Sequence, residues 1–432
     1  MRRQHWPDHG HGRAHNRNNS EYSTMTAATQ STGLAETAAG YVKQHLIDPA
    51  TCARCGSCEI VCPEEAIQMS EDGQYFGIDP ERCTGEHECL HSCSTDAILS
   101  WRMVPEGQLY SLEEQFTWEE LPAELEVDGH AVPMALDEEE AGLGNPAPAS
   151  ASTATTFLYT QHDPVTARIV SNRRVTSADA ETDIHHIVLD FGDNPYPWLE
   201  GQNVGVLPLG LDPHGHPHHM RAYSIASDRD GERAGSREMA LTVKRLVDEW
   251  DGKPYHGVAS NFLCDLEEGA EVRCIGPMGD KFLMPQDPQA QVLMICTGTG
   301  IAPMRGFIQR QQRMDPTPRQ PLQLFYGGRT PGEMAYYDEL LALPSTLLRT
   351  HMALSRSAEQ PRQYVQDVLR EQSGVVASVL ADDQGYIFIC GLISMEQSVI
   401  EVMADIAREH GLPADDLQHR LMQAGRLHIE TY

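Results

Sequence analysis

The chain has 432 residues, too long for one ordinary domain, so two or three domains are expected. Hydrophobic residues make up 40% of it and support packed cores, while a formal net charge of −31 argues against nucleic acid and anionic lipid as partners. The apolar runs are far shorter than a bilayer span, so we expect no membrane crossing.

The N-terminal stretch, residues 1–40, is polar, and the sequence predicts a disordered leader there, with Met25 as an alternative start. The first 24 residues lack the apolar core of a signal peptide. Seven of the eleven cysteines crowd into residues 52–93, unlike the even spacing of a secreted disulfide scaffold. We therefore expect a reducing compartment, and the cytoplasm is the predicted location.

Changes in composition divide the rest of the chain. Residues 106–140 hold twelve acidic side chains and neither Lys nor Arg, which is typical of an acidic linker. Short β-like runs separated by turn residues follow and favour an antiparallel barrel. After Pro285, buried-type strands alternate with helical stretches, as in a parallel α/β sheet. The predicted units are a cysteine-rich α+β domain (41–104), the linker (105–158), the barrel (159–285) and a Rossmann-like α/β domain (286–432).

The first cysteine group has the spacing Cys52-x2-Cys55-x2-Cys58-x3-Cys62, followed by Pro63. Three thiolates on a tight loop cap one face of an iron–sulfur cubane, and the fourth cysteine ligates the other cluster. Zinc is the alternative, but zinc sites usually use two separated cysteine pairs. By this crossed rule the first [4Fe–4S] cluster is held by Cys52, Cys55, Cys58 and Cys93.

The second cysteine group departs from the repeat. Cys83, Cys89 and Cys93 fit it, but Glu86 stands at the second cysteine position. The second cluster then has Cys62, Cys83 and Cys89, with Glu86 at the fourth corner. A carboxylate is a harder ligand than a thiolate, so a Glu-ligated [4Fe–4S] cluster, a [3Fe–4S] cluster and an occasionally empty site all remain open.

Several motifs follow in one order: Arg221-Ala-Tyr223-Ser224, Thr297-Gly298-Thr299-Gly300-Ile-Ala-Pro, Cys390-Gly-Leu and the final Glu430-Thr-Tyr432. From about residue 201 to the end, the chain resembles the plant-type ferredoxin–NADP⁺ reductases. The resemblance implies an FAD-binding barrel and an NADP-binding α/β domain. Arg221 would then contact the FAD pyrophosphate, Tyr223 would stack on the flavin, and Ser224 would hydrogen-bond its N5 atom. The remaining FAD-binding candidates are Val243, Lys244, Gly257, Val258, Ala259 and Ser260.

The nicotinamide site follows from the later motifs. The turn from Thr297 to Gly300 lies between an apolar strand and a helix, where backbone N–H groups receive a pyrophosphate. Ser355, Arg356, Arg362 and Tyr364 resemble a clamp for the 2′-phosphate and adenine of NADPH. The family pattern also implies that Tyr432 covers the flavin, while Cys390 and Glu430 line the hydride-transfer site. Cys264, Cys274 and Cys296 are expected to be packing residues.

From about residue 41 onward, the order of two-cluster ferredoxin, acidic linker and reductase resembles the reductase components of benzoyl-CoA 2,3-epoxidase. Members pass NADPH electrons to a separate di-iron oxygenase. The sequence thus predicts hydride transfer from NADPH to FAD and single-electron transfer through the clusters to that partner. A general ferredoxin–NADP⁺ oxidoreductase with a fused carrier is the first alternative. A non-catalytic redox sensor is the second.

Overall fold

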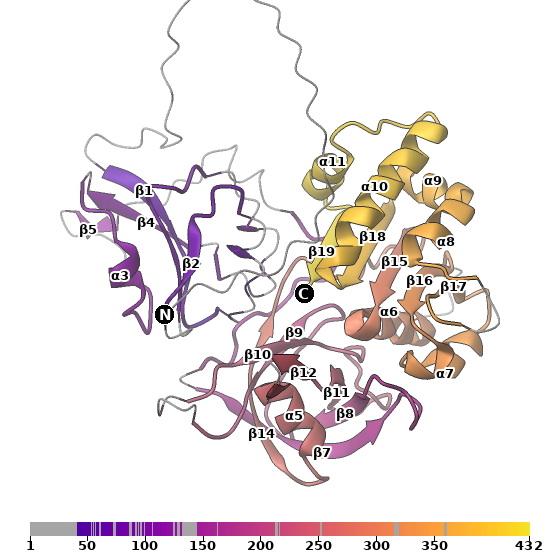
Figure 1. Ribbon diagram of the computed structural model, residues 1–432, viewed down its shortest axis with the longest axis horizontal. Coiled ribbons are helices and arrows are strands. Elements are labelled where there is room, and N and C mark those ends of the chain that lie inside the picture. Colours follow the sequence, from indigo (N-terminus) through magenta and orange to yellow (C-terminus); the bar gives the residue numbers. More distant parts are fainter. Residues whose placement is uncertain are drawn as a thin grey trace, which may run out of the picture.

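The computed structural model describes residues 41–432 except 53, 55, 57, 60–61, 72–74, 86–88, 91–92, 94, 96, 99, 106, 124–125, 128–129, 132–144, 162, 212–214, 216, 251–252, 315–318 and 358–360. The expected disordered leader and two candidate ligands, Cys55 and Glu86, lie outside the described residues. The described chain forms three units: an N-terminal unit, an antiparallel barrel and a parallel sheet whose edge strand is β19 (Leu427–Thr431). The C-terminus lies between the parallel sheet and the barrel (Figure 1). Within the described residues, no helix is both long and apolar enough to cross a bilayer.

The N-terminal unit is built from short antiparallel pairs around the cysteine loops. The pairs are β1 (Tyr41–Leu46) with β4 (Ser100–Pro105), β2 (Ile67–Met69) with β3 (Phe76–Ile78), and β5 (Glu126–Val127) with β6 (His130–Ala131). The helix α3 (Leu112–Gln115) begins at a capping box in which Ser111 and Glu114 bond each other's backbone N–H. Described cysteines take part in the small apolar core of this unit, so packing here depends on their loops.

The segment predicted as an acidic linker, residues 105–158, packs against other units near both ends. Gln115 donates to the Ile78 carbonyl at 2.8 Å and accepts from the Ile78 N–H at 2.9 Å. At the other end, Asn145 donates to the Leu427 carbonyl at 2.9 Å, and the Ser152 hydroxyl accepts from Arg229 at 2.9 Å. The domain limits stay a prediction, since the middle of the segment lies outside the described residues.

The second unit is a six-stranded antiparallel sheet in the order β10-β9-β14-β7-β8-β11. Its strands are β7 (Val165–Arg174), β8 (Ile184–Asp190), β9 (Asn203–Leu207), β10 (Arg221–Ser224), β11 (Glu238–Lys244) and β14 (Glu271–Met278). A bridge between Ile225 and Leu241 joins the two edges, which confirms the predicted barrel. Its interior is apolar, and α5 (Val258–Asp265) packs against β8 and β11. The hairpin β12 (Val247–Trp250) and β13 (Lys253–His256) precedes α5.

The third unit is a parallel sheet in the order β17-β16-β15-β18-β19, as predicted. Its strands are β15 (Gln291–Thr297), β16 (Leu322–Gly328), β17 (Leu348–Leu354), β18 (Gly385–Gly391) and β19 (Leu427–Thr431). The strand order reverses between β15 and β18, and such a switch point is where open α/β sheets bind ligands. The periodicity of the sequence had not indicated β19.

Helices cover both faces of this sheet and complete two apolar cores (Figure 1). On one face lie α6 (Ile301–Arg313) and α7 (Tyr337–Leu341), with the short 3₁₀ turns η1 (Gly298–Gly300) and η2 (Pro331–Glu333) leading into them. On the other face lie α8 (Val365–Glu371), α9 (Ser373–Ala381), α10 (Ile393–Glu409) and α11 (Leu417–Gln423). A sheet buried on both faces accounts for strands that read as continuous apolar runs.

Candidate functional site

The two cysteine loops begin with the same turn. Ile-Asp-Pro precedes both Cys52 and Cys83. The carbonyl of Asp48 accepts from the Cys52 N–H at 2.9 Å, and that of Asp79 accepts from the Cys83 N–H at 3.0 Å. This repeated Ile-Asp-Pro was a readable signal that sequence reasoning missed, and it extends the repeat beyond the cysteines themselves.

Backbone hydrogen bonds cross between the two repeats. The Asp48 N–H donates to the carbonyl of Ala97, four residues after Cys93, at 2.8 Å. The Asp79 N–H donates to the carbonyl of Ala66, four residues after Cys62, also at 2.8 Å. Each loop is therefore fixed beside the last cysteine of the other repeat, which is the arrangement that crossed ligation requires.

A small cavity lies at the first of these junctions. Cys52, Cys58 and Cys93 line it together with Ile47, Phe76 and Ile98. Thiols around an apolar pocket suit an iron–sulfur cluster, whose potential depends on burial and on hydrogen bonds to sulfur. The N–H of Arg54 supplies one such bond to the Cys52 sulfur at 3.4 Å.

The second junction brings together the other described cysteines. Burial and, after it, the neighbouring Cys83, Cys62 and Cys93 thiolates together raise the pKa of Cys89 to about 12. Such a thiol is held neutral until iron displaces its proton. Among the described residues, no three Cys, His, Asp or Glu side chains are close enough to bind a single metal ion. The ligand roles of Cys55 and Glu86 stay predictions.

The predicted flavin motif lies on β10, at the edge where it pairs with β9. Arg221 is exposed, Tyr223 is partly buried against the barrel core, and Ser224 is paired in register with Asn203. A guanidinium at the surface, a ring at the boundary and a hydroxyl beside a polar side chain match the three expected roles in FAD binding. Those roles stay predictions.

The other predicted FAD residues lie at β11 and the start of α5. Val243 is fully buried in the barrel core, so only its backbone is available to a ligand, whereas Lys244 is exposed. Gly257 precedes α5, and Val258 is exposed there while Ala259 is buried. The Ser260 hydroxyl accepts from the Leu246 N–H at 3.2 Å and donates to the Gly257 carbonyl at 3.2 Å, so it fixes this turn.

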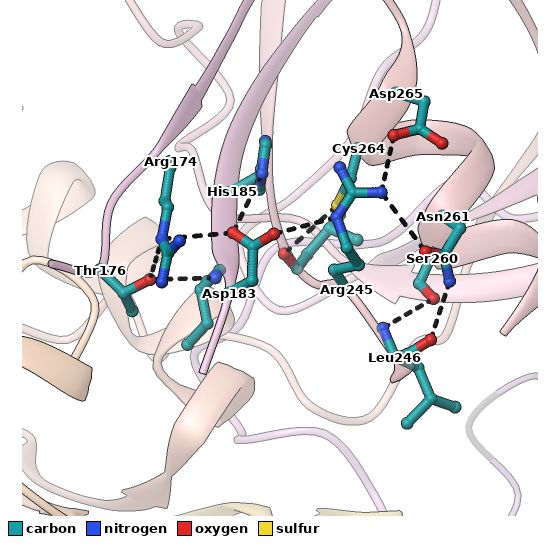
Figure 2. A network of polar contacts seen from close by, with 12 residues as sticks. Arg174, Thr176, Asp183, His185, Arg245, Leu246, Ser260, Asn261, Cys264 and Asp265 are labelled. Carbon is teal, nitrogen blue, oxygen red and sulfur yellow. Dashed lines mark hydrogen bonds and ion pairs between the residues drawn. The ribbon is translucent and has the colours of Figure 1, made fainter. Parts of the chain in front are cut away.

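A charged network that sequence reasoning missed holds α5 in place (Figure 2). Arg245 donates to Asp183 at 2.9 Å and to Asp265 of α5 at 2.7 Å. Asp183 also lies 3.4 Å from Arg174 and 3.2 Å from His185. The network ties the strands β7, β8 and β11 to the helix whose first turn is the predicted phosphate site.

The predicted pyrophosphate turn follows β15 at the switch point of the parallel sheet. Gly298 has φ +56°, in the left-handed region that glycine tolerates. A Cβ on Gly300 would lie 2.1 Å from the Cys390 carbonyl oxygen. The Thr297 hydroxyl accepts from the Leu392 N–H at 3.3 Å. The turn is therefore packed directly against the end of β18, and this close approach explains the glycine at position 300.

The C-terminal residues join this turn to the flavin motif. The Tyr432 and Thr299 hydroxyls are 2.5 Å apart, and Asn203 donates to Glu430 at 3.1 Å. Cys390 is paired in register with Glu430 and with Cys296. Burial raises the pKa of the Cys390 thiol well above its usual value, so the thiol is neutral and fits a positional role better than a nucleophilic one. Sequence reasoning had not singled out Asn203 as a site residue.

The four residues of the predicted 2′-phosphate clamp lie after β17. The hydroxyl of Ser355 donates to the Gly328 carbonyl at 3.2 Å. Arg356 is exposed and donates to Glu181 of the barrel at 3.3 Å. The Arg362 guanidinium lies 4.7 Å from the centre of the Tyr364 ring, so a planar cation occupies the face where adenine is expected to stack.

Comparisons with known proteins bear on the whole arrangement. A family model described as the oxidoreductase NAD-binding domain matches residues 294–401, and the 4Fe-4S dicluster domain matches residues 51–97. The chain is 36% identical over 287 residues to ferredoxin–NADP reductase leaf isozyme 2 of Oryza sativa subsp. indica, covering 64% of this chain and 78% of the relative. The chain belongs to the ferredoxin–NADP reductase family.

Other relatives agree with this assignment. The ferredoxin–NADP reductase of Thermosynechococcus vestitus is 32% identical over 320 residues, covering 71% of this chain and 83% of the relative. A solved structure of the ferredoxin–NADP⁺ reductase from Plasmodium falciparum has a TM-score of 0.52 at 21% identity, covers 65% of this chain and all of that one, and supports the fold. The reductase is thus an NADPH-dependent oxidoreductase whose family binds FAD and NADP, and its N-terminal unit contains the match to the 4Fe-4S dicluster domain.

Proposed function

We propose that this reductase takes hydride from NADPH at the C-terminal junction and delivers electrons singly through its ferredoxin-like unit. The observation that carries the proposal is the meeting of both cofactor motifs at one segment. Asn203, beside the Arg221–Ser224 motif, donates to Glu430 at 3.1 Å, while Tyr432 contacts Thr299 of the pyrophosphate turn. A flavin held by the first motif and a nicotinamide held by the second would meet there.

The residues of the chain bind and orient the reactants in this proposal. FAD, when bound, accepts the hydride and releases electrons one at a time. Arg221 would neutralise the FAD pyrophosphate, Tyr223 would stack on the flavin ring, and the Ser224 hydroxyl would hydrogen-bond its N5 atom. Tyr432 excludes water until nicotinamide replaces it. The neutral Cys390 thiol shapes the pocket without competing as a nucleophile.

The first cluster site is the proposed entry to the iron–sulfur chain. Arg54 lines the same cavity as Cys52, Cys58 and Cys93, and burial together with a smaller effect of the Arg221 charge lowers the pKa of its guanidinium. The first cluster would therefore lie on the flavin side of the N-terminal unit. The cluster at Cys62, Cys83 and Cys89 would then be the exit to the acceptor.

The proposed acceptor is a ferredoxin-type protein or another one-electron carrier, because relatives are named as ferredoxin–NADP reductases. A second candidate is the di-iron oxygenase of benzoyl-CoA 2,3-epoxidase. It is favoured by the fused two-cluster unit and by the segment from Ser111 to Pro122, which resembles reductase components of that system. The cytoplasmic location also stays a prediction.

Anaerobic reduction tests the electron path. NADPH added to protein reconstituted with FAD and iron should bleach the flavin and then give the EPR signal of reduced clusters. Clusters that stay oxidised would contradict the proposal. Oxygen consumption with benzoyl-CoA, measured with and without the purified oxygenase, then separates the two acceptors. Equal rates with unrelated ferredoxins and flavodoxins would favour the general carrier.

A further inference from the structure

A buried polar cluster joins the barrel to the α/β domain at a place where neither predicted cofactor site lies. The interdomain cluster consists of His186 on β8, Glu232 in the loop after β10, Arg305 on α6 and Tyr336 at the start of α7. His186 is 2% exposed, Arg305 5% and Tyr336 6%, so their polar groups depend on one another.

The centre of the interdomain cluster is a bidentate ion pair between Arg305 and Glu232. Arg305 donates to the two carboxylate oxygens of Glu232 at 2.7 and 2.9 Å, and also to the Ala226 carbonyl at 2.9 Å. Although burial alone would raise the pKa of Glu232, hydrogen bonds from His186 and Arg305 hold it well below its usual value. The pair therefore stays charged, and its fork geometry fixes both distance and orientation.

Tyr336 extends the interdomain cluster to two barrel strands. Its hydroxyl lies 2.8 Å from His186 Nδ1 and 2.7 Å from the Thr242 hydroxyl of β11. Its ring lies under the Arg305 guanidinium at 4.9 Å. Tyr336 has φ +60°, a conformation that is costly for a residue with a Cβ and persists only where surrounding contacts hold it.

One and two helical turns after Arg305, the same face of α6 forms further hydrogen bonds with the barrel loop that follows β10. Gln309 accepts from the Asp228 N–H at 3.2 Å, and Arg313 donates to the Glu232 carbonyl at 2.9 Å. Arg313 also pairs with Asp228, whose side chain is fully buried. Residues 226–232 are thus held along the length of the helix.

The position of these contacts links the two cofactor motifs. Helix α6 begins at Ile301, directly after the pyrophosphate turn, and the barrel loop that α6 binds begins just after Ser224. A rotation of α6 against the loop would therefore move nicotinamide relative to flavin. Reactions of this kind are sensitive to such shifts, since a misplacement of about 1 Å costs about 10²-fold in rate.

We propose that Arg305, Glu232, His186 and Tyr336 are positioning residues that set the distance between nicotinamide and flavin. None of them is among the predicted cofactor-binding residues, and they would act through α6 and the loop after β10. This inference rests on the proposed hydride transfer from NADPH to FAD. Failure of the unmodified protein to reduce its flavin with NADPH would overturn that function itself, whereas the variants below test only the positioning.

The test uses the full chain with FAD bound, in the variants Arg305→Gln and Tyr336→Phe. Tyr336→Phe keeps the ring beneath Arg305 and removes only the hydroxyl contacts. It therefore tests the positioning role even if Arg305→Gln does not fold. The matched control is Arg168→Gln, which breaks an exposed barrel ion pair with Glu271 at 2.8 Å. Turnover with NADPH and ferricyanide is measured with ordinary NADPH and with NADPH deuterated at the transferred position.

We expect kcat to fall by about tenfold in Tyr336→Phe and about 10²-fold in Arg305→Gln, with flavin content unchanged. The deuterium isotope effect on kcat should rise, because hydride transfer becomes the slow step. The control should keep the original values. Rates equal to the control would overturn the proposal, and so would lower rates with an unchanged isotope effect, which would indicate only a loss of folded enzyme.

Discussion

Replacing Gly300 by alanine should lower the activity with NADPH while leaving the rest of the structure unchanged. The added Cβ would lie 2.1 Å from the Cys390 carbonyl oxygen, whereas side-chain carbons essentially never come within 3.0 Å of such an atom. The pyrophosphate turn must therefore retreat by about 1 Å. A shift of that size costs about 10²-fold in rate, equivalent to about 2.7 kcal/mol of transition-state stabilisation.

The assay is kcat/KM for NADPH with ferricyanide as acceptor, alongside flavin content and thermal unfolding. Gly374→Ala is the matched control, because nothing lies within 4 Å of its Cβ and the residue is in α9. Gly374→Ala should leave kcat/KM unaltered and should raise the free energy of unfolding by at most about 1 kcal/mol. Normal kinetics in Gly300→Ala would refute the placement of NADPH on this turn.

Three further predictions concern single contacts. Tyr432→Phe removes the hydroxyl bond to Thr299 and should tighten NADP⁺ binding by about two- to tenfold in a spectral titration, while weaker binding would contradict the covering role. Glu181→Gln frees Arg356 and should lower KM for NADPH, but not for NADH, by at most about fivefold; an unchanged KM would argue against the clamp. Burial lowers the pKa of His428 from 6.5 to about 4. As the pH falls through that range, this histidine is protonated in the unfolded chain before it is protonated in the folded chain. The free energy of unfolding should therefore fall by up to about 3 kcal/mol. His428→Phe should remove this component in denaturant titrations, and an unchanged pH dependence would exclude His428 as its source.

Local patterns predicted the folds of the barrel and the parallel sheet well. Strands buried on both faces read as apolar runs, and the alternation expected after Pro285 includes the runs that form β15 and β18. The strand β19 was missed because Leu427-His-Ile-Glu-Thr is short and mixed in polarity. Its pairing with β18 depends on a long-range contact that no local window contains.

The candidate site was predictable where a cofactor demands a local motif. The turn from Thr297 to Gly300 is an example, because its glycine spacing is written in consecutive residues. Asn203 and Glu232 gave no such signal, since each acquires its role only when a distant element packs against it. The crossed backbone hydrogen bonds of Asp48 and Asp79 could not be predicted for the same reason, because each bond joins residues that are far apart in the sequence, although the repeated Ile-Asp-Pro can be read from it.

The docking of Asn145 on the Leu427 carbonyl has a kinetic consequence. It anchors the chain at the strand that carries Glu430 and leads to Tyr432, and the stretch back to Ala123 spans at most about 80 Å even when fully extended. In the proposed electron path, an N-terminal carrier within that radius would meet the flavin at an effective concentration of about 1 mM, however dilute the protein is. Internal delivery of electrons should therefore be first order and insensitive to competing free carriers at micromolar levels.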